Sequence, residues 1–416
     1  MTTQSETSLT QPEIDALLDR LGEPETSADP YPLYARLREL GPLQTVVDGA
    51  PVLFLSRYDD CAAGIRGTQF GAQTPEWCER ATPGWLERPV SWAFEAMLFL
   101  NPPDHTRLRR LVGEAFAPRR VEQMRDQVSA LARLALDRLA DAGADGGVVD
   151  LQQLLASTLP VSMIGSYLGV PEADWADLRR MGLQILHTVE FAVTEADLAT
   201  ADGAAIELRD YFAELTARRR AAPREDLTSD LLAIRDQGSD AQFSERELVL
   251  MLANLFLGGV DTMTNLLANG CAALLGHPAQ AALLRQRPEL AAGAVDEVLR
   301  FDAPVQVIGR VADTDTAIAG QPIRASQLVV SIVGAANRDA RRFADPDLLD
   351  ISRDQGQPLS FGGGIHYCLG APLARAEAAS YFAGLVSRFP AIELAGEPTR
   401  AGMVFRRFER LPVTIS

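Results

Sequence analysis

The stretch that most constrains this chain is residues 361–370, FGGGIHYCLG, which places one cysteine between a glycine-rich loop and a helical run. The three glycines at 362–364 allow the backbone to adopt positive φ and to approach a partner closely. The run that follows, APLARAEAASYFAGLV, is typical of a helix, and Pro372 suits its first turn. A thiolate on Cys368 would lie near the positive end of that helix and accept backbone N–H bonds, so we expect its pKa to be lowered. The segment is therefore suited to hold a thiolate ligand, although a lone cysteine is most often a buried structural residue.

The length of 416 residues would allow two or three domains. No Pro-, Gly- or Ser-rich linker divides the sequence and no internal repeat is visible. We therefore expect a flexible, acidic lead-in over residues 1–29 and a single domain over residues 30–416. Hydrophobic residues make up 47% and charged residues 23%, which is the balance of an ordinary globular chain.

Charge and composition argue against several classes of protein. A net charge of −17 argues against a general affinity for nucleic acid or for an anionic membrane. No apolar run reaches the roughly 18–20 residues that span a bilayer, and the polar first residues resemble neither a signal peptide nor an anchor, so we expect a cytoplasmic protein. The four cysteines show no paired spacing, which argues against zinc and iron–sulfur sites. The chain contains no lysine, which excludes a Walker P-loop and a pyridoxal Schiff base.

Apolar spacing predicts a mainly α-helical chain with a smaller β-rich part. Helices are expected from Asp104 onward, through most of residues 120–240, and over residues 244–276, which open with a capping box. A short strand is expected at GGVVDL. Residues 70–100 carry three of the four tryptophans without regular periodicity. Such a segment is either a functional loop or a loop held down by aromatic packing.

The middle of the longest predicted helix, GGVDT at residues 258–262, combines weak helix formers. Each glycine costs about 1 kcal/mol against alanine in a helix interior, and Asp261 and Thr262 compete for backbone hydrogen bonds. We therefore expect the helix to loosen or bend there. The alternative is that the glycines allow another helix to pack closely.

The cysteine segment resembles, position for position, the haem-ligand loop of the cytochrome P450 family. The matching positions are Phe361, Gly362, Gly364, His366, Cys368 and Gly370. The resemblance implies that Cys368 is the axial ligand of the iron of haem b, that Phe361 and Gly362 belong to the cofactor-binding loop, and that His366 bonds a haem propionate. It extends from about residue 30 to the end of the chain and implies a single cytochrome P450 fold.

Two further motifs match the family in the same order. Residues 258–262 match its small–Gly–x–acid–Thr pattern, which implies an oxygen-binding groove where the acid and the threonine deliver protons. Glu297 and Arg300 form a Glu-x-x-Arg pair, which alone is typical of a surface ion pair. The resemblance makes it a structural pair, completed by a later arginine that we expect within residues 337–350.

The resemblance also implies a set of haem propionate ligands. His105 and Arg109 lie four residues apart on one face of a predicted helix, which alone would usually be solvated. In the family this His and Arg bind the propionates, and bidentate Arg–carboxylate bonding gives the physical reason. Arg310 stands where the family often has another propionate ligand. Pro358 stands where many bacterial members have a histidine, so we expect one propionate contact to be missing without loss of haem binding.

The substrate pocket is expected to be apolar, with walls from the aromatic loop, the long helix and the C-terminal turn. The candidates are Trp92, Phe94, Leu98, Asn254, Leu257, Gly258, Val305, Val307 and Phe405. Asn254 lies one turn before Gly258 on the same helix face and offers either a polar contact for a substrate or a helix-packing contact. Residues 178–220 predict two helices joined by a loop, a pair that forms a lid in the family.

The resemblance implies a haem-thiolate monooxygenase, an oxidoreductase that inserts one oxygen atom from O2 into a C–H or C=C bond of a small or medium apolar substrate, such as a terpenoid or a polyketide. The alternatives are oxidative rearrangement, phenol coupling or peroxide-driven oxidation on the same scaffold, and a non-enzymatic recruiting scaffold.

The expected electron donor is a second protein. The chain carries no flavin or nicotinamide fingerprint, so we expect a small acidic iron–sulfur ferredoxin with its reductase. Arginines crowd residues 107–120 of an otherwise acidic chain. They would form a positive docking site, unless they only solvate helix ends.

Overall fold

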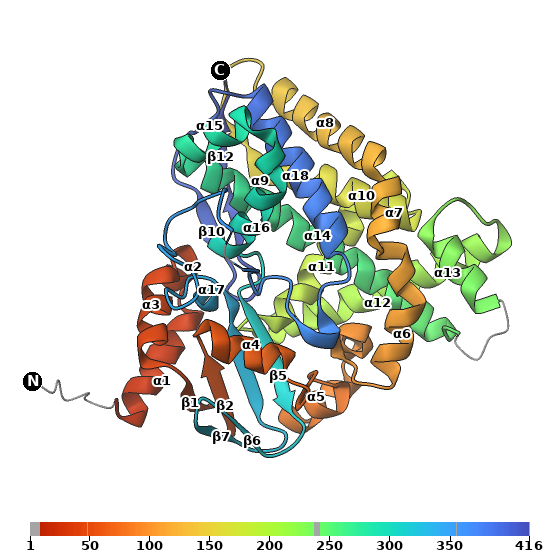
Figure 1. The fold of residues 1–416 in the computed structure, drawn as a ribbon. Helices are drawn as coiled ribbons and strands as arrows, with labels where there is room; N and C mark the ends of the chain where they lie inside the picture. The colour runs from red at the N-terminus through yellow and green to blue at the C-terminus, as the bar shows by residue number, and fades with distance from the viewer. Residues whose placement is uncertain (1–8, 48, 237–241, 355, 416) are drawn as a thin grey trace, which may run out of the picture.

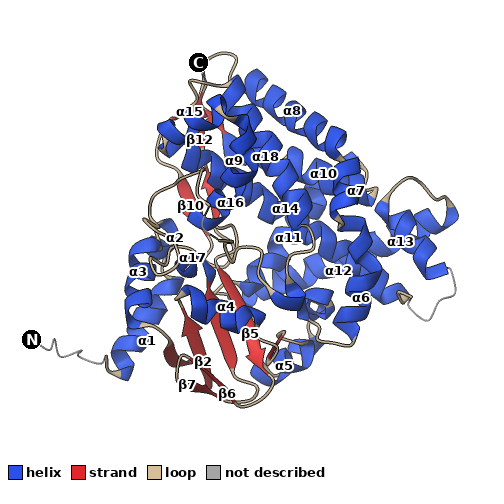
Figure 2. Ribbon diagram, in the orientation of Figure 1, coloured by secondary structure: helices blue, strands red, loops and turns tan. Residues whose placement is uncertain are grey.

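The computed structural model describes residues 9–47, 49–236, 242–354 and 356–415. Figure 1 shows a helical part that makes up most of the molecule, with the largest sheet at its lower end. Figure 2 separates the two parts by colour, with helices in blue and strands in red. The predicted class, mainly α with a smaller β-rich part, is confirmed.

The helices of the described residues follow one another from the N-terminus to the cysteine loop and beyond it. They are α1 (Gln11–Asp19), α2 (Pro24–Ala28), α3 (Tyr31–Leu40), α4 (Tyr58–Arg66), α5 (Pro75–Ala81), α6 (Asp104–Gly113), α7 (Pro118–Gln123), α8 (Arg125–Ala142), α9 (Leu151–Ala156), α10 (Leu159–Leu168), α11 (Trp175–Leu186), α12 (Glu195–Ala221), α13 (Leu227–Asp236), α14 (Glu245–Gly276), α15 (Pro278–Gln286), α16 (Ala291–Phe301), α17 (Val333–Ala336) and α18 (Ala371–Arg388).

Helix α14 runs through the core of the helical part. It packs against α9, α10, α11, α12, α16 and α18. The predicted capping box is confirmed: the Ser244 hydroxyl accepts the Glu247 N–H at 3.2 Å, and the Glu247 carboxylate accepts the Ser244 N–H at 2.7 Å. By length and composition α14 could cross a membrane, which the sequence reading did not anticipate. However, 67% of its apolar window is buried, as in the core helix of a globular protein.

The weak stretch at 258–262 does not interrupt α14, which is assigned as continuous helix from Glu245 to Gly276. The predicted loosening or bend within this continuous helix stays a prediction. Thr262 donates its hydroxyl proton to the Gly258 carbonyl at 2.5 Å, one turn back. A Cβ at Gly259 would lie 3.0 Å from Cγ1 of Ile164 in α10, so this glycine does allow close packing.

The main sheet has five strands in the order β1-β2-β8-β5-β3. Strands β2 and β8 are parallel, and the other neighbours are antiparallel. The strands are β1 (Leu43–Val47), β2 (Ala50–Leu55), β3 (Phe70–Gly71), β5 (Val307–Ala312) and β8 (Leu328–Ile332). Arg310 lies opposite Val329 in this register, so β5 fixes the position of Arg310.

Three smaller sheets complete the β part. They pair β6 (Thr316–Ile318) with β7 (Gln321–Ile323), β10 (Thr399–Ala401) with β11 (Arg407–Arg410), and β12 (Pro412–Thr414) with both β4 (Val149–Asp150) and β9 (Glu393–Leu394). The strand predicted at GGVVDL is confirmed as β4.

The N-terminal segment differs from the predicted flexible lead-in. Residues 11–28 form α1, a 3₁₀ turn at Arg20–Gly22, and α2. Leu18 and Leu21 are buried in one apolar cluster with residues of α3, β2 and β8. Apolar residues at helical spacing therefore dock this segment on the main sheet, while residues 1–8 lie outside the described residues.

The aromatic segment at residues 70–100 is ordered by short helical turns. After α5 come the 3₁₀ turns Trp85–Glu87, Pro89–Glu95 and Met97–Phe99. The Trp85 and Phe94 rings meet edge to face with centroids 4.9 Å apart, and Phe94 and Phe99 lie at 4.6 Å. Aromatic packing therefore orders this loop, as the simpler of the two interpretations predicts. The two helices and loop predicted over residues 178–220 are confirmed as α11 and α12.

Candidate functional site

The cysteine loop folds back on itself before α18 begins. Gly362 and Gly364 have φ values of 70° and 60°, a region that favours glycine. Cys368 donates its backbone N–H to the Phe361 carbonyl at 2.9 Å, which closes the loop. Helix α18 then begins at Ala371, with a proline in its first turn as predicted.

The thiol of Cys368 lies at the N-terminal end of α18. Its pKa is raised, mainly by burial, so the predicted lowering is wrong. The backbone N–H groups of Gly370 and Ala371 and the charge of Arg109 act in the predicted direction but do not outweigh burial. A bound metal ion changes this balance, because a coordinating thiol is deprotonated.

Four basic side chains from three parts of the chain lie close together beside this loop. His105 and Arg109 come from α6, Arg310 from β5, and His366 from the cysteine loop. The rings of His105 and His366 have centroids 4.3 Å apart. Among the described residues, Nδ1 of His105 and Nε2 of His366 are buried without a hydrogen-bond partner. We call these four residues the basic cradle.

The basic cradle has no acidic partner among the described residues. Burial, together with the neighbouring Arg310, His105 and Arg109, lowers the pKa of His366 to about 3. Burial also lowers the pKa of Arg310 to about 10. An uncompensated buried charge is costly, and the carboxylates of a haem would supply the missing counter-charge. The residues present therefore fit the group that the sequence predicts.

The middle of α14 forms the second part of the site. Asn254, Gly258 and Thr262, one turn apart, are only partly buried or exposed although most of the helix is buried. A Cβ at Gly258 would meet nothing within 4 Å. This face of α14 therefore borders open space beside Gly258.

Asp261 is buried beside this face, and its carboxylate lies 3.3 Å from Nη2 of Arg179 in α11. Burial raises the pKa of Asp261 to about 6, and Arg179 and Arg407 act against that rise. The sequence reading missed Arg179, because only the packing of α11 against α14 brings the two residues together.

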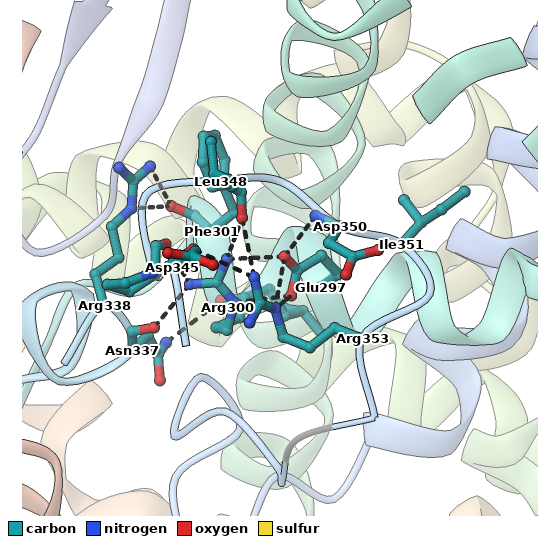
Figure 3. Close-up of polar contacts among 12 residues, drawn as sticks. Glu297, Arg300, Phe301, Asn337, Arg338, Asp345, Leu348, Asp350, Ile351 and Arg353 are labelled. Carbon is teal, nitrogen blue, oxygen red and sulfur yellow. Dashed lines mark hydrogen bonds and ion pairs between the residues drawn. The ribbon is translucent and has the colours of Figure 1, made fainter. Parts of the chain in front are cut away.

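The Glu-x-x-Arg pair is buried, so the surface alternative is wrong. Figure 3 shows Glu297 and Arg300 facing each other, with N–O distances of 2.7 and 2.8 Å. Arg300 also donates to the carbonyls of Asn337, Pro346 and Leu348. Every one of these acceptors lies in residues 337–350.

The third member of this network is Arg353, three residues beyond the predicted segment. Its Nε lies 3.2 Å from the Glu297 carboxylate (Figure 3). Asn337 connects the network to the cysteine loop, because its side chain donates to the Ser360 hydroxyl at 2.8 Å and accepts the Leu359 N–H at 2.8 Å. The network therefore supports the residues that lead into the loop.

The structure brings together only some of the predicted pocket residues. Val305 and Phe405 form an isolated antiparallel bridge, so the two lie side by side. Leu257 lies against α11, with its Cδ2 2.8 Å from where a Cβ of Gly182 would be. Gly258 is exposed, and Leu98 is 47% exposed. The other candidates, Trp92, Phe94, Asn254 and Val307, are buried or partly buried. Their contact with a substrate stays a prediction.

Comparison with known proteins agrees with this geometry. The family model described as "Cytochrome P450" matches residues 284–400. The polyketide biosynthesis cytochrome P450 PksS of Bacillus subtilis is 35% identical over 400 residues, 93% of this chain and 96% of that protein. The cytochrome P450 monooxygenase PikC of Streptomyces venezuelae is 38% identical over 401 residues, 95% of this chain and 92% of that protein.

Solved structures show the same fold along the chain. P450BioI, solved in complex with an acyl carrier protein that carries hexadec-9Z-enoic acid, has a TM-score of 0.86 at 32% identity. The match covers 94% of this chain and 100% of that chain. The chain therefore belongs to the cytochrome P450 family and is an oxidoreductase that uses haem b and O2.

Proposed function

We propose that this protein is a ferredoxin-dependent monooxygenase that inserts one oxygen atom into a C–H or C=C bond of an apolar natural product of small or medium size. The names of PksS and PikC and that of the vitamin D(3) 25-hydroxylase of Pseudonocardia autotrophica, which is 35% identical over 394 residues, support this chemistry. We also propose that the enzyme is cytoplasmic.

The observation that carries the proposal is the pairing of two half-sites. The basic cradle and Cys368 offer charge neutralisation and a thiolate, and α14 offers open space beside Gly258 and Thr262. Haem b, when bound, supplies the activation of O2. Cys368 would ligate its iron, and His105, Arg109, Arg310 and His366 would hold its carboxylates.

The side chains of α14 would control protons on the other side of the site. Asp261, with a pKa of about 6, can both hold and release a proton near neutral pH. Thr262 can turn its hydroxyl from the Gly258 carbonyl toward a ligand in the open space. Val305 and Phe405 would orient the substrate by apolar contact.

The proposed docking site for the ferredoxin is narrower than residues 107–120 as a whole. Arg107 pairs with Glu247, Arg120 lies 3.5 Å from Asp230, and Arg109 belongs to the basic cradle. Arg110 and Arg119 are exposed, with no ion pair among the described residues. We assign the dock to these two arginines, on α6 and at the start of α7.

The proposal can be tested with the purified protein, a bacterial ferredoxin and its reductase. Reduction under CO should give the absorption band of a thiolate-ligated haem. With labelled O2 and a panel of polyketide and terpenoid probes, one labelled oxygen atom should enter the product, and turnover should need both redox proteins. Turnover with hydrogen peroxide alone, at the same rate, would favour the peroxide-driven alternative.

A further inference from the structure

Glu190 connects the lid to the turn that carries Phe405. It follows the 3₁₀ turn His187–Val189, in the connection between α11 and α12. One oxygen of its carboxylate accepts the backbone N–H groups of Met403 and Val404 at 2.8 and 2.9 Å. The other oxygen accepts the N–H of Phe405 at 3.1 Å.

The turn that Glu190 binds is tight and is anchored on its other side. Gly402 opens it with φ 78°, and a Cβ at this position would lie 2.2 Å from the Phe405 carbonyl oxygen, so glycine is required. The Gln306 N–H donates to the Val404 carbonyl at 2.9 Å, and the Arg406 N–H donates to Pro304 at 2.8 Å. The segment at 304–306 thus binds one carbonyl and one N–H of this region, and the Glu190 carboxylate accepts three further N–H groups of the turn.

Among the described residues no backbone acceptor satisfies those three N–H groups, and the Glu190 carboxylate is their partner. Charge-assisted bonds of this kind are among the stronger hydrogen bonds in proteins. Their loss would leave these three N–H groups without that partner, while residues 304–306 still bond to Val404 and Arg406. Glu190, in the connection between α11 and α12, therefore helps to fix the conformation of the turn whose residue Phe405 pairs with Val305.

We propose that Glu190 is a positioning residue that couples the lid to the pocket edge and sets ligand affinity through Phe405. The inference rests on the proposed function only in taking Phe405 as a pocket residue. When the connection between α11 and α12 moves, it either carries the turn with it or breaks three hydrogen bonds. Both consequences make the shape of the pocket depend on the position of the lid.

The test uses the full-length holoenzyme in five forms: wild type, Glu190→Gln, Phe405→Ala, the double variant, and Glu172→Gln as a control. Glu172 is an exposed carboxylate on the 3₁₀ turn before α11. Glu190→Asp, which keeps the charge but shortens the side chain, is a second variant in case glutamine disturbs folding. The readouts are amide hydrogen exchange at residues 403–405 and a spectral titration with econazole.

We expect amide exchange at residues 403–405 to become at least roughly 10-fold faster in Glu190→Gln, and to stay unchanged in Glu172→Gln. Econazole binding should weaken by about 5- to 10-fold in Glu190→Gln, but by less than about 2-fold when the same change is made in Phe405→Ala, because coupled residues are not additive. Unchanged amide exchange at residues 403–405 in both Glu190 variants would contradict the proposed coupling of Glu190 to the turn. If Glu190→Gln weakened econazole binding equally in wild type and in Phe405→Ala, Glu190 would not act on ligand affinity through Phe405.

The exchange measurement does not depend on haem chemistry. A wild-type protein without the thiolate-type CO spectrum would therefore contradict the proposed function alone. The coupling of Glu190 to the turn would still be measured.

Discussion

Two groups of buried basic side chains lie near the cysteine loop, and they differ in their counter-charges. Arg300 and Arg353 share the Glu297 carboxylate, and three backbone carbonyls accept further bonds from Arg300. The basic cradle holds two histidines and two arginines without an acidic partner among the described residues. The paired group supports the residues that lead into the loop, whereas the group without acidic partners is where we propose that the haem carboxylates bind.

The largest expected effect concerns the ligand that the cradle surrounds. Cys368→Ala should abolish the thiolate-type CO spectrum and all oxygenase activity, because no other described cysteine lies in this loop. The basic cradle should still bind the carboxylates of some haem. The haem content after purification measures this binding. A Cys368→Ala protein that kept the thiolate-type spectrum would contradict the assignment of Cys368 as the ligand of the haem iron.

Breaking the paired group should damage the fold itself. Glu297→Gln removes the carboxylate that Arg300 and Arg353 share, and loss of one partner in a buried ion pair costs about 3–5 kcal/mol. Urea unfolding of the apoprotein measures this loss. Glu289→Gln, which breaks the exposed pair with Arg287, is the matched control and should change little. If Glu297→Gln and Glu289→Gln had the same free energy of unfolding, the buried Glu297 pair would contribute no more to stability than an exposed ion pair.

Asp261 lies between the two cases, as a buried acid with one ion-pair partner among the described residues, Arg179. Its pKa is raised from 3.8 to about 6, so the folded state loses stability as pH rises from about 4 to about 6. Urea unfolding at pH 7 should therefore show a free energy of unfolding for Asp261→Asn that is higher than that of wild type by up to about 3 kcal/mol. Below pH ~4 the two free energies should be equal. The partner Arg179, left unpaired, reduces that gain.

The same change tests proton delivery. Asp261→Asn and Thr262→Ala should both bind haem and probe ligands normally but divert electrons into peroxide. Product formed per electron, compared with wild type over pH 5 to 8, measures the diversion. If both variants kept wild-type coupling, proton delivery would have to come from the substrate.

Removing one member of the unpaired group should have the opposite effect on the apoprotein and the holoenzyme. Arg310→Leu removes a buried charge that has no counter-ion, so urea unfolding of the apoprotein should be unchanged or shifted to higher urea. Haem should be lost to apomyoglobin about 10-fold faster, because one charge-assisted contact is missing. If the Arg310→Leu apoprotein were less stable and kept its haem normally, Arg310 would have a structural role like that of Arg300 and would not be a haem ligand.

The smallest effect is expected at the surface. Arg110→Glu and Arg119→Glu should each slow first-electron transfer from a ferredoxin by about 2- to 5-fold at low salt, and the difference should shrink above about 0.1 M salt. Stopped-flow reduction across a salt series measures it, with Arg133→Glu on α8 as a control. A rate that ignored both substitutions would show that this face is not the dock.

Local patterns in the sequence were sufficient for much of the fold and part of the site. The capping box of α14, the start of α6 at Asp104 and the glycines of the cysteine loop all depend on neighbouring residues, so they could be predicted. The motif match located His105, Arg109, Arg310 and His366, and the structure places them in one cradle.

Other features depend on contacts between distant segments and could not be predicted. Helix α14 stays helical through residues 258–262 because it packs against several other helices, which offsets the weak local propensity. The raised pKa of Cys368 follows from burial, which no local pattern reports. Arg353 and Arg179 reach their partners only because the chain returns to Glu297 and α11 lies on α14.

The sequence by itself determined which chemical groups are present and their local geometry: a cysteine on a glycine loop at a helix start, an acid and a threonine one turn after a glycine, and no lysine anywhere. These are properties of short stretches, where neighbouring residues set the backbone conformation. The tertiary structure decided which charges are satisfied. Burial and pairing are set by segments far apart in the chain, and only their packing gives Glu297 two arginines, leaves the cradle without an acid and places Glu190 on the turn of Phe405.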